Sequence, residues 1–412
     1  MTRRPLPPVI KPPAPAAGAQ AEPAVARYGL LALGFRPFFL VAGGWAALSL
    51  IAWLAVLFGL LAPPRYLAGT HWHAHEMLFG YTAAVIAGFL LTAARNWSGL
   101  PTAAGGRLAA LVALWLAARL APWLGAPAWL IGALDIAFFP ALALSLRRAL
   151  WQGPNPVNRL FLVVFGGFTL ASLLVNLDGM GVLPGLAARG QRLMLDLVIV
   201  LMLVVGGRVM PFFTRAAIPG AAPVSRPWLD KLVFGAVLTM LALHLALPAS
   251  PLAGRLAGVA ALAAGVLLLA RLAGWHDRRA WGLPMLAVLY LGFLWLAAGL
   301  ILDGIAAFRL LPPSIALHAI TAGAIGTLTL GMMARVTLGH TGRAMHASRL
   351  TLLAFALVTA AALLRSIAVW LAPGLYTGWM LAAGTCWIGA FALFTAVYAP
   401  MLIAPRVDGK PG

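Results

Sequence analysis

The sequence has few charged residues and almost no cysteine, and both shortages exclude some classes of protein. Only 9% of its 412 residues are Asp, Glu, Lys or Arg, whereas a soluble domain of average composition has about 25%. The single cysteine, Cys386, rules out an internal disulfide and a Cys-x-x-Cys-His haem attachment. A soluble globular domain is therefore excluded, and so is a cysteine-based metal site.

Apolar residues are abundant instead. Hydrophobic residues make up 63% of the chain, and the mean hydropathy is +0.96. Apolar runs of about 18–25 residues recur, long enough to cross the hydrocarbon core as helices. None shows the alternation of a membrane strand. The sequence predicts an all-α, polytopic bundle of about twelve transmembrane spans, centred on residues 34–60, 73–94, 107–121, 126–146, 157–176, 192–210, 229–247, 254–273, 283–307, 314–335, 349–371 and 376–402.

The formal charge of +20 is explained by the way the basic residues are distributed between the two sides of the membrane. With the N-terminus in the cytoplasm, 21 of the 29 basic residues fall on inner segments and six on outer loops. This is the positive-inside bias of a membrane protein, and it predicts that both termini are cytoplasmic. No nucleic-acid partner is needed to explain the charge, and the expected surroundings are the lipid bilayer.

Three regions are expected along the chain. Residues 1–27 are rich in Pro and Ala and are predicted to form a disordered cytoplasmic tail. This stretch has no apolar core, so it does not read as a cleaved signal peptide. Residues 28–404 form the twelve-helix transmembrane domain, and residues 405–412 form a short cytoplasmic tail.

Histidines are concentrated at one point. The segment THWHAHEMLFGY starts the second span with His71, His73 and His75, followed by Glu76, although the chain has only 8 histidines. The predicted orientation puts this segment near the outer surface. His71 is expected to lie in the preceding loop and is the weakest ligand candidate.

His318 starts the tenth span at a similar outer depth. Imidazoles without cysteines suit copper, zinc or haem iron. We therefore predict that His73 or His75 faces His318 across the bundle and holds a redox metal. Haem b iron is the first candidate and copper is also considered. Glu76 is expected to hydrogen-bond a ring nitrogen and so fix its tautomer.

Several ordered motifs resemble the NnrS family, beginning with GFRPFFL, WHAHEMLFGY and GFLLTAARNWSG, and continuing with GRVMPFFT and HAITAGAIGTLTLGMMARVTLGHTGR. The resemblance implies a bacterial inner-membrane protein of about twelve helices that contains haem and copper. It also implies a role in nitric oxide metabolism, including denitrification, and in resistance to nitrosative stress. The motif positions in this chain are His73, His75, Glu76, His318 and His340, together with Arg36, Arg208 and Arg335.

The three arginines lie at inner span ends. They are expected either to bind an anionic ligand or partner through charge-assisted hydrogen bonds or to anchor the spans at the lipid headgroups. His340, also at an inner end, is a further metal-ligand candidate.

Two functions remain open from the sequence. The first is a haem- or copper-binding membrane protein that binds or handles nitric oxide, with electrons for any turnover supplied by quinol or a donor protein. No flavin or nucleotide motif is present, so enzymatic activity stays undecided. The alternative is a transporter or channel in which outer His and Asp groups handle protons or a metal cation.

The predicted topology can be checked with reporter fusions. A cytoplasm-dependent reporter placed after Gly412 should be active, because positive-inside bias keeps that end in the cytoplasm. A periplasm-dependent reporter placed there should be silent, and the same reporter in the loop at Gly181 should be active. The reverse pattern would contradict every inner and outer placement made here.

Overall fold

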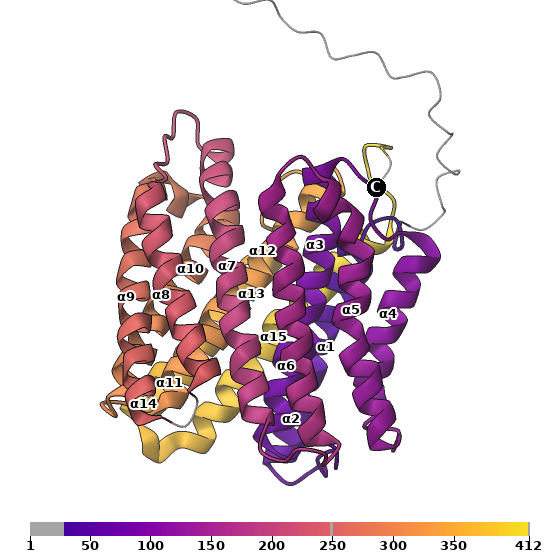
Figure 1. Cartoon of the computed structure of the whole chain (residues 1–412). Coiled ribbons are helices and arrows are strands. Elements are labelled where there is room, and N and C mark those ends of the chain that lie inside the picture. The colour runs from indigo at the N-terminus through magenta and orange to yellow at the C-terminus, as the bar shows by residue number, and fades with distance from the viewer. Residues whose placement is uncertain (1–28, 248–249, 411–412) are drawn as a thin grey trace, which may run out of the picture.

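The computed structural model describes residues 29–247 and 250–410, and within these ranges every regular element is a helix (Figure 1). The predicted tail of residues 1–27 lies outside the described residues. Twelve helical spans follow one another: α1 Phe35–Leu57, α2–η1–α3 Thr70–Ser98, α4 Gly105–Leu120, α5 Ala128–Gln152, η2–α6 Pro156–Gly179, α7 Ala187–Ala217, α8 Pro227–Ala246, α9 Pro251–Trp275, α10 Pro284–Ala307, α11–η4–α12 Pro313–His340, α13–η5–α14 Arg349–Leu371 and η6–α15 Pro373–Ile403.

Eleven of these helices in the described residues are long and apolar enough to cross a membrane. The prediction of an all-α polytopic bundle is confirmed. The remaining helix, α4, has 16 residues, which corresponds to about 24 Å at 1.5 Å per residue. It is short for the roughly 30 Å hydrocarbon core.

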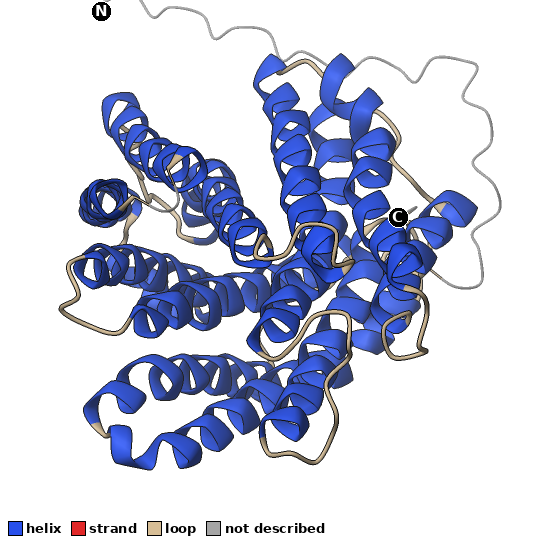
Figure 2. Ribbon diagram, turned by 60° about the horizontal axis from the view of Figure 1, so that its bottom comes forward, coloured by secondary structure: helices blue, strands red, loops and turns tan. Residues whose placement is uncertain are grey.

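Helix α7 lies between two groups of helices. Figure 1 shows α6, α5 and α4 on one side of it and α8, α9 and α10 on the other, and α7 packs against both α6 and α8. Figure 2, viewed closer to the bundle axis, shows the helices in stacked rows. Helix α7 continues through Pro211 to Ala217, beyond residue 210, where the sequence predicts that the sixth span ends.

Small residues allow the closest helix contacts. A Cβ atom added to Gly304 of α10 would lie 2.7 Å from the carbonyl oxygen of Gly258 on α9. Only glycine tolerates this approach, which is the usual way that helices associate tightly in lipid.

Three spans contain a π-helical segment in their outer halves. They are η1 (Glu76–Thr82), η4 (Ala319–Ile325) and η5 (Leu364–Ala368). In Figure 1 this predicted outer side is the lower end, away from the C-terminus, where α2, α11 and α14 are labelled. Single π-helical turns are rare and often lie at functional sites. Here η1 begins directly after His75, and η4 begins directly after His318.

Candidate functional site

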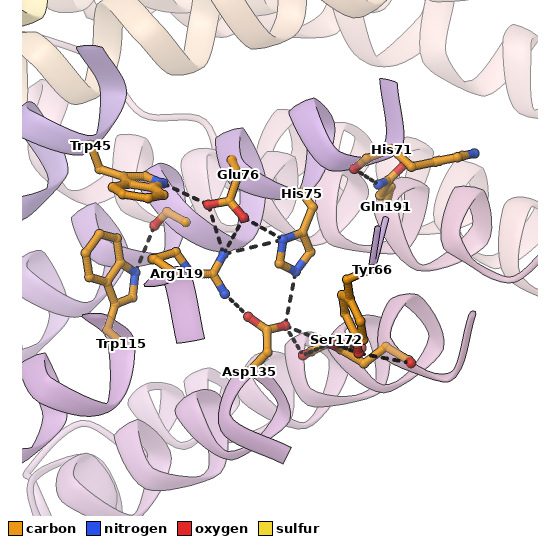
Figure 3. A network of polar contacts seen from close by, with 12 residues as sticks. Trp45, Tyr66, His71, His75, Glu76, Trp115, Arg119, Asp135, Ser172 and Gln191 are labelled. Atoms are coloured by element: carbon orange, nitrogen blue, oxygen red, sulfur yellow. Dashed lines mark hydrogen bonds and ion pairs between the residues drawn. The ribbon is translucent and has the colours of Figure 1, made fainter. Parts of the chain in front are cut away.

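Four ionisable side chains meet at the outer ends of three spans. His75 ends α2, Glu76 begins η1, Arg119 lies in the last turn of α4, and Asp135 lies near the start of α5. Each is at most 5% exposed. Figure 3 shows them facing one another in a single polar network.

The network is closed by ion pairs and hydrogen bonds. His75 Nδ1 lies 3.1 Å from Glu76 Oε1, and its Nε2 lies 3.1 Å from Asp135 Oδ2. Arg119 pairs with both carboxylates, at 3.3 Å from Glu76 Oε2 and through Nη2 with Asp135 Oδ1. Each carboxylate therefore has a cation and an imidazole as neighbours, which offsets the cost of removing these charges from water.

Neutral groups extend the network toward the outer loop. Asn176 Nδ2 donates to Asp135 Oδ2 at 2.7 Å, and Ser172 Oγ donates to the same oxygen at 3.0 Å. Tyr66, in the loop before α2, donates to Asn176 Oδ1 at 2.8 Å. Burial raises the pKa of the Tyr66 phenol above its ordinary value, so this hydroxyl stays a donor at neutral pH.

Gly80 allows the other end of the network to form. Trp45 on α1 donates from Nε1 to Glu76 Oε2 at 2.8 Å. A Cβ atom on Gly80 would lie 2.8 Å from that indole nitrogen and 3.0 Å from the carboxylate oxygen. The Gly80 carbonyl, in the π-helical segment, accepts from Trp115 Nε1 at 3.1 Å. Trp45 and Trp115, whose ring centroids lie 5.8 Å apart, thus both hydrogen-bond to η1.

His75 has no nitrogen left for a metal. Its Nε2 faces Asp135, and its Nδ1 faces Glu76 as well as Arg119 Nη1 at 3.4 Å. Nδ1 donates to Glu76 when it carries a proton and accepts from Arg119 when it does not. In both protonation states the nitrogen is engaged.

His73 lies on a different face of α2. Its ring stacks on Trp53 of α1, with ring centroids 4.8 Å apart. Its Nδ1 is buried and has no hydrogen-bond partner among the described residues. His318 is close enough to interact electrostatically with His73 and with Arg365 of η5, and Arg365 also interacts with His73. The structure thus brings His73 and His318 into one neighbourhood.

The tautomer of His318 follows from its hydrogen bond. Nδ1 lies 2.7 Å from the carbonyl oxygen of Ser314, which can only accept, so Nδ1 carries the proton. In the neutral ring Nε2 then has a free lone pair, which is the usual preparation of a histidine ligand.

The family model of the NnrS protein matches residues 29–406. The chain belongs to the NnrS family. No curated protein matches the chain. Membership of the NnrS family supports a multi-pass membrane protein related to nitric oxide, and the resemblance noted in the sequence is confirmed.

The NnrS motif residues do not form one site. His75 and Glu76 belong to the ion network, whereas His73 and His318 lie beside Arg365. His340 is at the inner end of α12, 22 positions beyond His318 and thus about 33 Å away along the helix. Its ring packs on Phe35 at 5.5 Å. No group of three or more His, Cys, Asp or Glu residues is arranged for a metal ion within residues 29–247 and 250–410.

The three motif arginines have separate surroundings. Arg36 is fully buried and donates to the carbonyl oxygens of Leu402 at 3.0 Å and Ala404 at 2.7 Å, at the end of α15. A cation at a helix C-terminus satisfies free carbonyls and opposes the helix dipole. Lipid anchoring is therefore the wrong explanation for Arg36.

Arg208 and Arg335 pack on aromatic rings. Arg208 donates to Asn158 Oδ1 at 2.7 Å and lies over Trp97. The guanidinium carbon of Arg335 lies 4.0 Å from the ring centroid of Phe213, and Arg335 is 8% exposed. Its burial likewise argues against simple lipid anchoring, while a role in binding an anion stays a prediction.

Sequence reasoning missed part of the site. Arg119 is buried in the ion network, and Arg365 interacts with His73 and His318, yet neither arginine is among the candidate residues of the sequence analysis. The expectation that His71 lies in a loop is wrong, because α2 begins at Thr70; its side chain is exposed and contacts Gln191 at 3.0 Å. Arg119 could have been found as an outer cation at a depth similar to that of Glu76 and Asp135.

Replacing Arg119 with Leu should destabilise the protein strongly. The change leaves two buried carboxylates facing one imidazole, and breaking a buried ion pair in this way costs about 3–5 kcal/mol. Unfolding of the purified variant in mixed micelles would measure the loss. Arg65→Gln, at an exposed loop position, is the matched control and should unfold like the parent. Parental stability of Arg119→Leu would contradict the assigned role of the network.

Proposed function

We propose that this NnrS-family protein holds a redox metal between His73 and His318, with haem b iron as the first candidate, and binds nitric oxide there. One observation carries the proposal. His318 Nδ1 is engaged by Ser314, which leaves Nε2 available, and His73 lies close by with an unpartnered buried nitrogen.

The donor set suits haem better than a bare metal ion. A haem iron needs only one or two axial imidazoles from the protein. Zinc sites use three or four protein ligands, and this neighbourhood offers two imidazoles and a guanidinium. Arg365 can pair with a carboxylate of the haem periphery, because Arg binds carboxylates in a bidentate manner. Copper at His75 is disfavoured, since both ring nitrogens already face polar partners.

Other nearby groups also favour a bound ligand. Trp295 of α10 packs against Gly323 of η4, and its buried Nε1 has no partner among the described residues. Such an indole N–H is costly in an apolar interior unless something accepts from it. The Trp295 indole therefore offers a hydrogen-bond donor to a ligand bound next to η4.

An apolar cavity offers space for a neutral gas molecule. A cavity of about 100 Å³ lies between α3, α7, α10 and α12, with walls that include Val85, Met202, Phe293 and Leu328. Its outermost wall residues, Thr82 and Ile325, end η1 and η4, the segments that follow His75 and His318. The volume is below the roughly 150 Å³ that accommodates benzene, so it suits a diatomic molecule and is too small for a macrocycle.

The chain's own residues then have separate tasks. His73 and His318 would hold the iron, and nitric oxide would bind the ferrous iron in place of one of the two imidazoles. Trp53 orients the His73 ring by stacking, and the network of His75, Glu76, Arg119 and Asp135 holds α2 in place. The protein would act in the bacterial inner membrane in resistance to nitrosative stress, and any turnover would draw electrons from quinol or a donor protein.

Absorption spectra of single alanine variants test this proposal. His73→Ala and His318→Ala should lose most of the Soret absorbance of the purified protein, because each removes one of the two imidazoles that would hold the haem. His71→Ala is the matched control, since that exposed ring contacts Gln191 and its removal should leave the spectrum intact. Metal analysis of the same samples identifies the ion.

Full haem retention in both His73→Ala and His318→Ala would refute the proposed site. A parent protein without a Soret band or bound copper would instead favour the alternative, a transporter or channel that handles protons or metal cations through its outer His and Asp groups.

A further inference from the structure

A second polar group lies at the outer ends of α7, α8 and α10. Arg192 donates from Nε to Asp196 Oδ1 at 3.0 Å and from Nη2 to Asp303 Oδ2 at 2.8 Å. His244, near the end of α8, places Nδ1 at 2.8 Å from Asp196 Oδ2. Asp196 is fully buried, whereas the His244 side chain is 24% exposed. None of these residues belongs to the network around His75.

The His244 ring borders a cavity of about 470 Å³, here called the α6–α8 cavity. Leu170 and Leu174 of α6 form one wall, and Leu241 and Leu245 of α8 form another. Figure 1 shows α6 and α8 on the two sides of α7. Leu170 and Leu245 are 41% and 51% exposed on apolar spans, so the cavity has walls that continue onto the lipid-facing surface.

The pair of His244 and Asp196 is prepared for a ligand that carries a hydroxyl or a carbonyl. The carboxylate of Asp196 accepts from Nδ1, and both of its oxygens are used by His244 and Arg192. His244 Nε2 has no hydrogen-bond partner in the described part of the chain. In the neutral ring Nε2 accepts from a hydroxyl, and in the protonated ring it donates to a carbonyl. A quinol has the first group and a quinone has the second.

Charge argues against an anionic lipid headgroup as the occupant. Arg189 and Arg192 both line the cavity, and Arg192 faces two carboxylates, Asp196 and Asp303, so two cations and two carboxylates leave the site without net charge. A neutral ring with an apolar tail fits such a cavity, whose walls are mostly leucine.

We infer that the α6–α8 cavity binds the headgroup of a membrane quinol or quinone, with His244 Nε2 as its hydrogen-bond partner and Asp196 as the group that orients the ring. The tail lies along the leucines toward the bilayer. Binding at this cavity does not depend on the metal proposed between His73 and His318.

The position also suits electron supply to that metal. Gln191, next to Arg192 on α7, contacts His71 of α2. Asp303, on the other side, belongs to α10, which packs against α11 and η4 next to His318. Helix α7 therefore contacts α2 on one side and lines the cavity on the other.

Calorimetric titration of the full-length protein in detergent with decylubiquinone tests the inference. The parent should bind it saturably, and His244→Leu should weaken binding about tenfold or more, because the headgroup loses its hydrogen bond to the protein. His276→Leu, at an exposed histidine of the inner loop, is the matched control and should bind like the parent. Leu174→Trp fills the cavity without removing a charge and should also abolish binding.

Equal affinity of the parent, His244→Leu and Leu174→Trp would overturn the inference. Full displacement of decylubiquinone by an equal concentration of dioleoyl phosphatidylglycerol would also overturn it and assign the cavity to lipid. The Soret absorbance of the same variants should stay at the parental level. This readout separates failure of the quinone site from failure of the metal site.

Discussion

The pairing of Arg119 with Glu76 and Asp135 is the interaction on which the outer half of the bundle depends. An isolated charge within the membrane is costly, and the two acids here belong to different spans. Each charge can be buried only if the others arrive with it, so α2, α4 and α5 must assemble together. Ser172 and Asn176 bring α6 into the same arrangement. The Arg119 side chain at the outer end of α4 is 1% exposed, so this short helix is held at that end by the ion pairs.

Composition and charge bias were sufficient to predict the bundle. The number of spans and the contact of Glu76 with a histidine ring both follow from hydropathy and local spacing, while the outer position of the histidines stays a prediction from the basic-residue asymmetry. The sequence did not show which of His73 and His75 keeps a ring nitrogen free for a ligand. Their side chains point to different faces of one helix, and their partners, Trp53, Asp135 and Arg119, come from three other helices. A helix that is apolar on nearly all sides gives no sequence signal that shows which of its faces packs against which neighbouring helix.

The π-helical segments explain why the sequence does not predict the direction in which some side chains face. Each adds a residue to a turn and rotates the rest of the span relative to a regular α-helix. Depth along the span is still predictable, because the rise per residue changes little, but the facing of the side chains beyond the segment is not. Gly80 and Gly323 lie inside two of these segments, and each lies against a tryptophan, Trp45 or Trp295. In the sequence such glycines look like ordinary contacts between membrane helices.

The two outer polar groups use carboxylate and imidazole in opposite ways. Around His75, two carboxylates and a guanidinium occupy both ring nitrogens, so the imidazole has a structural role. At His244 a single carboxylate occupies one nitrogen and leaves the other toward a cavity. His318 resembles His244, with a backbone carbonyl as the partner of Nδ1. The number of partners around each ring, more than the number of histidines in a segment, therefore distinguishes the rings that can take a ligand from those that hold helices together.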